Sequence, residues 1–366
     1  MKQVGKSVDP GVCLHGENRC GLARREMLKA LGLAGTAALS PVHLFSQASN
    51  AKVNKLTAKG GAIDVHHHHQ PPGLGGRGGG RGKGGPAWTP ELSLEQMDKF
   101  GIAAALLSMT QMGDILYDGT EKGRAAVRTG NEYGAKVMHD HPTRFGLFAA
   151  VPLPDIEGCL KEIEYGFETL KCDGIGIYTN DNGNRWPGDP YYEPMYQELN
   201  RRKAIVFIHP LAPKCCTNLN DGVPFNMNEF DFDITRCVSS LLANGVLHRY
   251  PDVRFIVPHS GGTLPVLAGR IKDRFPRDAK HAEYIPNGVW PELQKLHYEC
   301  AHATFPAPLA ALTKFVPTSQ LLFGTDFSPE PIETTVDELP TSGLSRETLQ
   351  ALERGNAEKL FPRFKL

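Results

Sequence analysis

Two histidines separated by one residue, His66 and His68, are the positions in this sequence that most directly suggest chemistry. They lie in the stretch Asp64-Val65-His66-His67-His68, which follows the apolar segment Gly61-Ala62-Ile63. Alternate side chains of a β-strand point to the same face of its sheet, so a strand here would hold the two imidazoles side by side. Neighbouring imidazoles on one face are typical of a metal site.

Three later apolar segments also end in a residue that can bind a metal or transfer a proton. His209, His259 and Asp326 each close such a segment, at the end of the runs 204–208, 254–258 and 321–325. Four strand ends that carry histidine or aspartate indicate a single pocket.

The run of four histidines from His66 to His69 has other interpretations. In a terminal position it would indicate a purification tag, and in a loop it would indicate loose metal adsorption. A lone His209 or His259 is more often a structural histidine than a ligand. The run is internal, however, and it follows a strand-like segment. Together with Asp326, these histidines favour one active site.

The elements that must position these residues alternate along the chain. Strand-like runs are predicted at 62–66, 103–109, 145–151, 174–178, 204–209, 255–259, 296–300 and 321–326. Helical patterns are predicted at 91–100, 122–141, 155–170, 191–202, 230–248, 264–275, 306–315 and 345–360. Eight strands alternating with helices predict a (β/α)8 TIM barrel.

This barrel prediction explains where the chemistry lies. The active site of such a barrel is at the C-terminal ends of its strands, where all the polar residues singled out above are expected. An open, doubly wound sheet is the alternative, and a nucleotide-binding version would need a glycine motif between a strand and a helix. The glycine-rich segment 73–85 has no helix opening inside it, so a nucleotide site is not expected.

The N-terminal segment 1–51 resembles an export signal. Arg24 and Arg25 precede a largely apolar stretch at 30–39, in the order of a twin-arginine signal peptide, with removal expected after Ala51. The stretch is shorter than the ~20 apolar residues of a transmembrane helix. We therefore expect a periplasmic protein whose single barrel domain spans 52–366, with the glycine-rich segment as an insertion. Export in the folded state would allow a metal to be selected in the cytoplasm.

Charge and cysteine content exclude some classes of partner. The chain has 40 basic and 40 acidic residues, and removal of 1–51 takes away six and three of them, which leaves a net charge of −3. This balance favours a small-molecule substrate over a nucleic acid or, after export, a membrane surface; it leaves the oligomeric state open, a homo-oligomer included. No C-x-x-C pattern occurs, so we expect mostly free, buried thiols.

Taken in order, these motifs resemble the amidohydrolase superfamily. They are D-x-H-x-H at 64–68, the histidine at 209, H-x-G-G at 259–262 and G-T-D-F at 324–327. The pattern is most similar to the branch of aminocarboxymuconate semialdehyde decarboxylase and related metal-dependent decarboxylases. Segments at 153–155, 198–202, 267–270 and 320–327 are similar to the 6-methylsalicylate decarboxylase group of that branch.

The resemblance implies a ligand set and a role for one further histidine. His66, His68, His209 and Asp326 would hold one divalent metal, with zinc expected and manganese as the alternative. His259 would act beside it as an acid, a base or an electrostatic group. Binuclear relatives use a modified lysine at the end of strand four, whereas the segment 174–179 contains none, which favours a single metal.

Such a site supports two kinds of chemistry. It can activate water, which suits a hydrolase or lactonase, or it can bind a carboxylate and an adjacent hydroxyl as a Lewis acid, which suits decarboxylation of a salicylate-like acid. The ligands do not choose between them, and only the resemblance favours decarboxylation with Asp326 or His259 as the proton donor. A periplasmic metal-binding protein without turnover is a further alternative.

Three more residues are candidates for the substrate pocket: Glu299 on strand seven, and Trp186 and Asp189 after strand four. For each, a structural role has at least equal weight. Glu299 would then pair with an arginine of the barrel, and Trp186 would pack under a loop.

Overall fold

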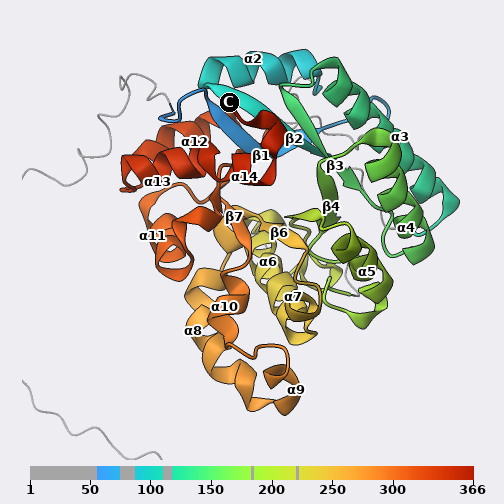
Figure 1. Cartoon of the computed structure of the whole chain (residues 1–366), viewed down its shortest axis with the longest axis vertical. Helices are drawn as coiled ribbons and strands as arrows, with labels where there is room; N and C mark the ends of the chain where they lie inside the picture. Colours follow the sequence, from blue (N-terminus) through green and yellow to red (C-terminus); the bar gives the residue numbers. More distant parts are fainter. Residues whose placement is uncertain (1–55, 75–86, 110–117, 183–184, 220–221) are drawn as a thin grey trace, which may run out of the picture. The chain divides into compact units, whose positions relative to one another are not determined.

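The computed structural model describes residues 56–74, 87–109, 118–182, 185–219 and 222–366 (Figure 1). The predicted signal peptide and residues 75–85 of the glycine-rich insertion lie outside these ranges, so both stay predictions. Within the described ranges, no helix combines the length and the apolar character that a membrane span requires.

Eight parallel strands form one sheet in the order β1 to β8, with each strand paired to the next. They are β1 Ala62–His69, β2 Ile102–Met109, β3 Phe145–Ala150, β4 Gly174–Tyr178, β5 Ile205–His209, β6 Arg254–Val257, β7 His297–Glu299 and β8 Leu321–Leu322. Bridges from Asp64 to Phe323 and from His67 to Phe327 join β1 to the segment after β8. The sheet therefore closes on itself, and the predicted (β/α)8 barrel is confirmed.

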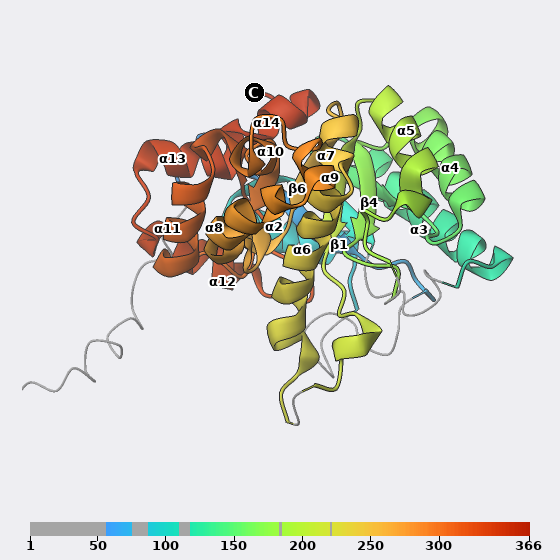
Figure 2. The ribbon, with the colours of Figure 1, turned by 90° about the horizontal axis from the view of Figure 1, so that it is seen from below.

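Helices surround the strands (Figures 1 and 2). They are α2 Pro90–Phe100, α3 Glu121–Asp140, α4 Ile156–Tyr165, α5 Glu193–Arg201, α6 Phe225–Ala243, α7 Val246–Arg249, α8 Leu264–Arg274, α9 Ala279–Ala282, α10 Val289–Leu293, α11 Pro306–Phe315, α12 Ile332–Glu338, α13 Arg346–Gln350 and α14 Ala357–Leu360. Side-chain caps mark several starts; Thr89, for example, accepts a hydrogen bond from the amide of Leu92 at the start of α2.

Some predicted boundaries are wrong, and the reasons are local. The helix predicted at 230–248 begins earlier and is broken into α6 and α7 by Gly245, whose φ of +70° is left-handed. The strand predicted at 321–326 pairs as a strand only at Leu321–Leu322, and Asp326 has a φ of +58°. The helices α9, α10 and α12 are not among the predicted elements.

The floor of the site inside the barrel is apolar. Phe207 stacks on Phe148 with a centroid distance of 5.2 Å, and the ring of His66 lies 4.9 Å from that of Phe207. Phe361, just after α14, packs edge-on against Phe148 from the C-terminal segment. The same cluster includes the buried residues Ile63, Val65, Ala104, Leu106, Ile205, Ile256, Leu322, Ala357, Leu360 and Phe364. Burial of these residues supplies part of the hydrophobic stabilisation of the barrel.

The cysteines of the described residues are free thiols, as predicted. Cys159, Cys172, Cys237 and Cys300 are buried, whereas Cys215 is exposed and Cys216 is partly exposed. The adjacent pair therefore departs from the expectation of burial.

Candidate active site

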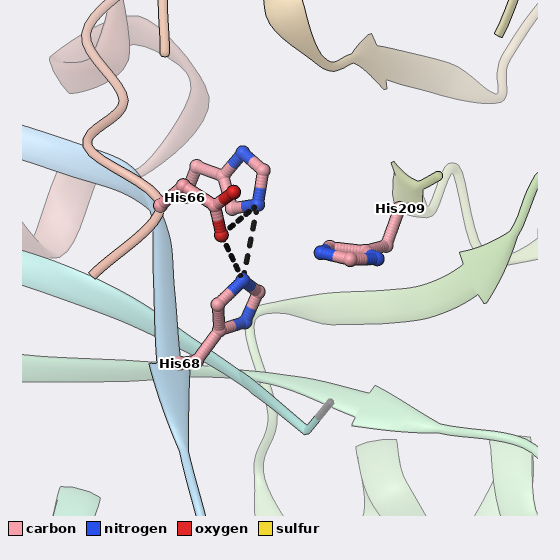
Figure 3. Close-up of side chains that lie close together, drawn as sticks. His66, His68 and His209 are labelled. Atoms are coloured by element: carbon pink, nitrogen blue, oxygen red, sulfur yellow. Dashed lines mark hydrogen bonds and ion pairs between the residues drawn. The ribbon is translucent and has the colours of Figure 1, made fainter. Parts of the chain in front are cut away.

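The structure brings together the four residues predicted to bind a metal, from three separate parts of the chain (Figure 3). The Nε2 atoms of His66 and His68 on β1 lie 3.1 Å apart. Oδ1 of Asp326, after β8, lies 2.7 Å from Nε2 of His68 and 3.3 Å from Nε2 of His66. The ring of His209, at the end of β5, faces both, with centroid distances of 5.2 and 4.9 Å. One ligand atom from each of the four lies within 4.8 Å of the others.

The other ring nitrogens of these histidines show that the cluster fits a cation. Nδ1 of His66 lies 2.9 Å from a carboxylate oxygen of Glu299, and Nδ1 of His209 lies 2.9 Å from the carbonyl oxygen of Pro210. Both partners only accept hydrogen bonds, so in the neutral form of each ring the proton is on Nδ1 and Nε2 carries the lone pair that a cation would bind. Lone pairs that converge beside a carboxylate, with second partners orienting the rings, are the arrangement of a metal site.

The electrostatics of the cluster agree with this conclusion. Burial opposes protonation of His66, but the charges of Asp326 and Glu299 outweigh it and raise the pKa of His66 to about 10. Burial and the neighbouring histidines hold the pKa of His209 well below its ordinary value. Burial would raise the pKa of Asp326, yet the nearby histidines, His66 foremost, hold it well below its ordinary value. The carboxylates of Asp326 and Glu299 therefore stabilise a positive charge within this cluster.

Asp64, the first residue of the D-x-H-x-H motif, ties β1 to the segment after β8. Its buried carboxylate accepts hydrogen bonds from the amide of His66 (3.1 Å), the amide of Thr325 (3.1 Å) and the hydroxyl of Thr325 (2.6 Å). Nδ1 of His67 lies 2.9 Å from Oδ2, the oxygen that also accepts from the Thr325 hydroxyl. Asp64 thus fixes the backbone that carries His66 relative to the backbone that carries Asp326.

Glu299 at the end of β7 is fully buried behind the cluster. Besides Nδ1 of His66, its carboxylate accepts hydrogen bonds from the amides of His259 (2.7 Å) and Ala301 (2.7 Å). A Cβ at Gly324 would lie only 2.0 Å from this carboxylate, so the close approach requires glycine there. Within the described residues, the hydrogen-bond partners of Glu299 are His66 and the amides of His259 and Ala301 and not the suggested arginine, so Glu299 orients His66 and His259 from behind.

His259 stands beside the four candidate ligands. Its ring stacks on that of His66 at 5.5 Å, and its Nε2 lies 3.7 Å from Oδ2 of Asp326. This Nε2 is buried and has no hydrogen-bond partner, whereas Nδ1 lies 3.6 Å from the carboxylate of Asp231 on α6. Burial lowers the pKa of His259, but the nearby carboxylates, Asp231 first, raise it to about 9.

His302, after β7, belongs to the same cluster and was missed by the sequence analysis. Its Nε2 lies 2.9 Å from Oδ2 of Asp326, and its ring lies 4.7 Å from that of His259. The predicted strand seven ends at Cys300, two residues before His302, so His302 was not among the predicted strand-end residues. A search that included the two residues after each strand would have found it.

The remaining pocket candidates have structural roles. The indole of Trp186 donates a hydrogen bond of 2.8 Å to buried Asp233, which also accepts one from the side-chain NH2 group of Asn180. Asp189 accepts a hydrogen bond from the amide of Tyr191 and so begins the short 3-10 turn Pro190–Tyr192. These hydrogen bonds give both residues a structural role, and their contact with a substrate stays a prediction.

Comparison with known proteins places the chain among enzymes of related fold. The family model described as amidohydrolase matches residues 63–363. A 6-methylsalicylic acid decarboxylase of Penicillium expansum is 33% identical over 313 residues, which cover 83% of this chain and 97% of that protein.

Solved structures show the same barrel. A 2,6-dihydroxybenzoate decarboxylase from Rhizobium superimposes with a TM-score of 0.73 at 21% identity, covering 83% of this chain and 99% of that one. A dihydroxybenzoic acid decarboxylase from Polaromonas, solved with bound manganese and the inhibitor 2-nitroresorcinol, gives a TM-score of 0.66 at 19% identity, with coverage of 84% and 98%.

Proposed function

The chain belongs to the amidohydrolase family, and from this premise we propose that it is a carboxy-lyase that removes the carboxyl group of a hydroxy-aromatic, salicylate-like acid without oxidation. One observation carries the proposal. Nε2 of His259 is buried, makes no hydrogen bond within the described residues and lies beside the cluster that fits a cation. The relative from Penicillium expansum, matched over nearly its whole length, supports the choice of a 2-hydroxybenzoate as the substrate class.

We propose that His66, His68, His209 and Asp326 hold one divalent cation. Three imidazole nitrogens and one carboxylate suit zinc, and manganese is the alternative, as in the decarboxylase from Polaromonas. When bound, the cation would supply a Lewis acid for the carboxylate and the adjacent hydroxyl of the substrate.

Asp326 and His259 have different roles in the proposed reaction. Both oxygens of Asp326 already have partners, Oδ1 with His68 and Oδ2 with His302. This carboxylate is therefore suited to binding the cation and not to donating a proton. His259 is the better donor, because its Nε2 makes no hydrogen bond in the part of the chain that the structure describes and the carboxylates of Asp231 and Asp326 favour its protonated form.

The proposed reaction balances without a redox cofactor. The proton on Nε2 of His259 forms a bond with the ring carbon that bears the carboxylate. The bond from that carbon to the carboxylate then breaks, its electron pair restores the aromatic ring, and carbon dioxide leaves. Water returns a proton to His259.

The test is a panel of hydroxybenzoates incubated with metal-loaded enzyme, with carbon dioxide release as the measurement. In deuterated water, the product should carry one deuterium at the carbon that lost the carboxylate. The His259→Asn variant should retain its metal and lose about 10²- to 10⁴-fold in rate, the range of general acid catalysis. If the enzyme opens lactones or cleaves esters and leaves every hydroxybenzoate intact, the hydrolase alternative replaces this proposal.

We also propose export by the twin-arginine route, on the sequence motif alone. Replacement of both Arg24 and Arg25 by lysine should retain the protein in the cytoplasm of an expressing bacterium, measured by cell fractionation. Unchanged periplasmic appearance of this variant would contradict the proposal.

A further inference from the structure

We propose that His302 is a positioning residue that holds Asp326 in the orientation its role requires. The inference rests on the proposed function and deepens it, because it assigns the control of one site carboxylate to a residue outside the four candidate ligands. Three features of the structure carry it: the contact with Asp326, the backbone conformation of His302, and its place at the solvent side of the site.

The contact divides the two oxygens of Asp326 between different neighbours. Oδ1 faces the histidines of β1, whereas Oδ2 lies 2.9 Å from Nε2 of His302. An ionised carboxylate only accepts hydrogen bonds, so His302 donates from Nε2. With Oδ2 held in this way, rotation of the carboxylate about its Cβ–Cγ bond would break a hydrogen bond, and Oδ1 stays directed at the ligand cluster.

The backbone of His302 is in a conformation that does not favour histidine. Its φ is +58°, in the left-handed region that glycine adopts readily and other residues adopt at a cost. Asp326 itself has the same φ, and His259 and Ser260 have values of +49° and +55°. Unfavourable backbone at a functional site is maintained by the contacts around it. For His302, the hydrogen bond from its side chain to Asp326 is a contact that would maintain this conformation.

His302 lies at the solvent side of Asp326. Its side chain is 36% exposed, whereas that of Asp326 is 11% exposed and that of His259 is 6% exposed. Removal of the imidazole would therefore free Oδ2 and expose it to water. The candidate ligand would lose its fixed orientation, and His259 would lose the neighbouring ring that lies 4.7 Å from its own.

The decisive variant is His302→Gly, because it separates the backbone from the side chain. Glycine adopts the φ of +58° without strain, so the melting temperature of this variant should equal or exceed that of the parent. The donor to Asp326 is lost, so zinc affinity should fall about 10- to 100-fold, the range for removal of groups that orient metal ligands. Zinc affinity is measured by competition with a chelating dye, which requires no substrate.

Two further variants test the hydrogen bond itself. His302→Gln keeps an N–H at the position of Nε2 and should restore most of the zinc affinity. His302→Ala lacks the donor and keeps the strained backbone, so it should show the loss of affinity together with a lower melting temperature than His302→Gly. Failure of His302→Gln to exceed His302→Ala in affinity would overturn the proposal.

Lys203→Gly is the matched control. Lys203 also has a left-handed φ, +52°, but it precedes β5 at the opposite end of the barrel from the site. This variant should gain stability in the same way and leave zinc affinity and turnover unchanged. Loss of affinity in Lys203→Gly equal to that in His302→Gly would show a general effect of the glycine and would overturn the assignment.

Kinetics distinguish positioning from substrate binding or metal binding by His302. For a positioning residue, kcat of His302→Gly at saturating zinc should fall while KM changes little. A raised KM with unchanged kcat would instead make His302 a substrate contact. His259, His302 and Asp326 could also hold a cation themselves; two zinc ions per parent chain and one per His302→Gly chain would make His302 a ligand. Both outcomes overturn the proposal.

If the parent enzyme decarboxylates no hydroxybenzoate, the proposed function fails, and the zinc affinities still decide the role of His302.

Discussion

The two ends of the barrel interior use the same strands for opposite purposes. On β5, Phe207 points into the apolar cluster, and His209 two residues later faces the histidines of β1. Below this level the interior is filled by apolar side chains, and the C-terminal segment closes it with Phe361 and Phe364. Above it lie buried carboxylates, converging histidines and non-glycine residues with left-handed backbone.

On β5, a residue of the apolar cluster and a candidate metal ligand are therefore only two positions apart. The apolar end gains free energy from burial and packing. The polar end contains buried charges that are costly unless they are paired, and it is held by hydrogen bonds between distant segments. Substitutions at the two ends should therefore change different measurements.

The largest effect is expected at the polar end, from His209→Ala. Loss of one of four candidate ligands should reduce bound zinc below one per chain and reduce decarboxylation by at least about 10³-fold, since the Lewis acid is worth several kcal/mol. Elemental analysis and the rate of carbon dioxide release are the measurements. Full metal content and full activity in this variant, or two metals per chain in the parent, would break the assignment of a single-metal site.

A large effect of the other kind is expected from Phe361→Ala at the apolar end. This ring is 2% exposed and packs against Phe148. Its removal should lower the free energy of unfolding by about 3–5 kcal/mol, the usual cost of truncating a buried phenylalanine. Denaturant unfolding measures the loss. The folded fraction should keep its metal and its kcat; a matching loss of kcat would show that the two ends are not independent.

Glu299→Gln should give a smaller effect and sharpens the comparison, because it changes charge and hydrogen bonding with little change of shape. The amide oxygen can still accept from His66 and from the amide of His259, but the NH2 group cannot accept from the amide of Ala301. Zinc affinity should fall about 10- to 100-fold. Isothermal titration with zinc measures this. An unchanged affinity would mean that the charge of Glu299 does not affect how strongly the ligands bind zinc.

The smallest effect is expected for Thr325→Val, which removes one hydroxyl from the link between β1 and the segment after β8. The hydroxyl donates to Asp64 and accepts from the amide of Phe327, so its loss leaves that amide unpaired. The free energy of unfolding should fall by about 1–2 kcal/mol. Thermal unfolding checks this value, and metal content should stay at one per chain. A loss of metal with no loss of stability would show that this link acts on the site alone.

Much of the fold was predictable because its signals are local. The alternation of apolar strands with helical patterns needs only neighbouring residues, and it predicted all eight strands and the place of His66, His68, His209, His259 and Asp326 at strand ends. The prediction of the amidohydrolase family is likewise confirmed. Strand boundaries failed at Asp326 and His259, because left-handed backbone at a functional site departs from the local pattern.

By itself, the sequence determined the barrel, its family and the residues that could meet at one end of it. Only the tertiary structure decided how they meet. Asp64 bonds to Thr325 across 261 positions of sequence, and Glu299 bonds to His66 across 233. Contacts over such separations depend on the closure of β1 against the segment after β8, which no local pattern encodes. The roles of Asp64, Glu299 and His302 therefore became visible only when the barrel closed.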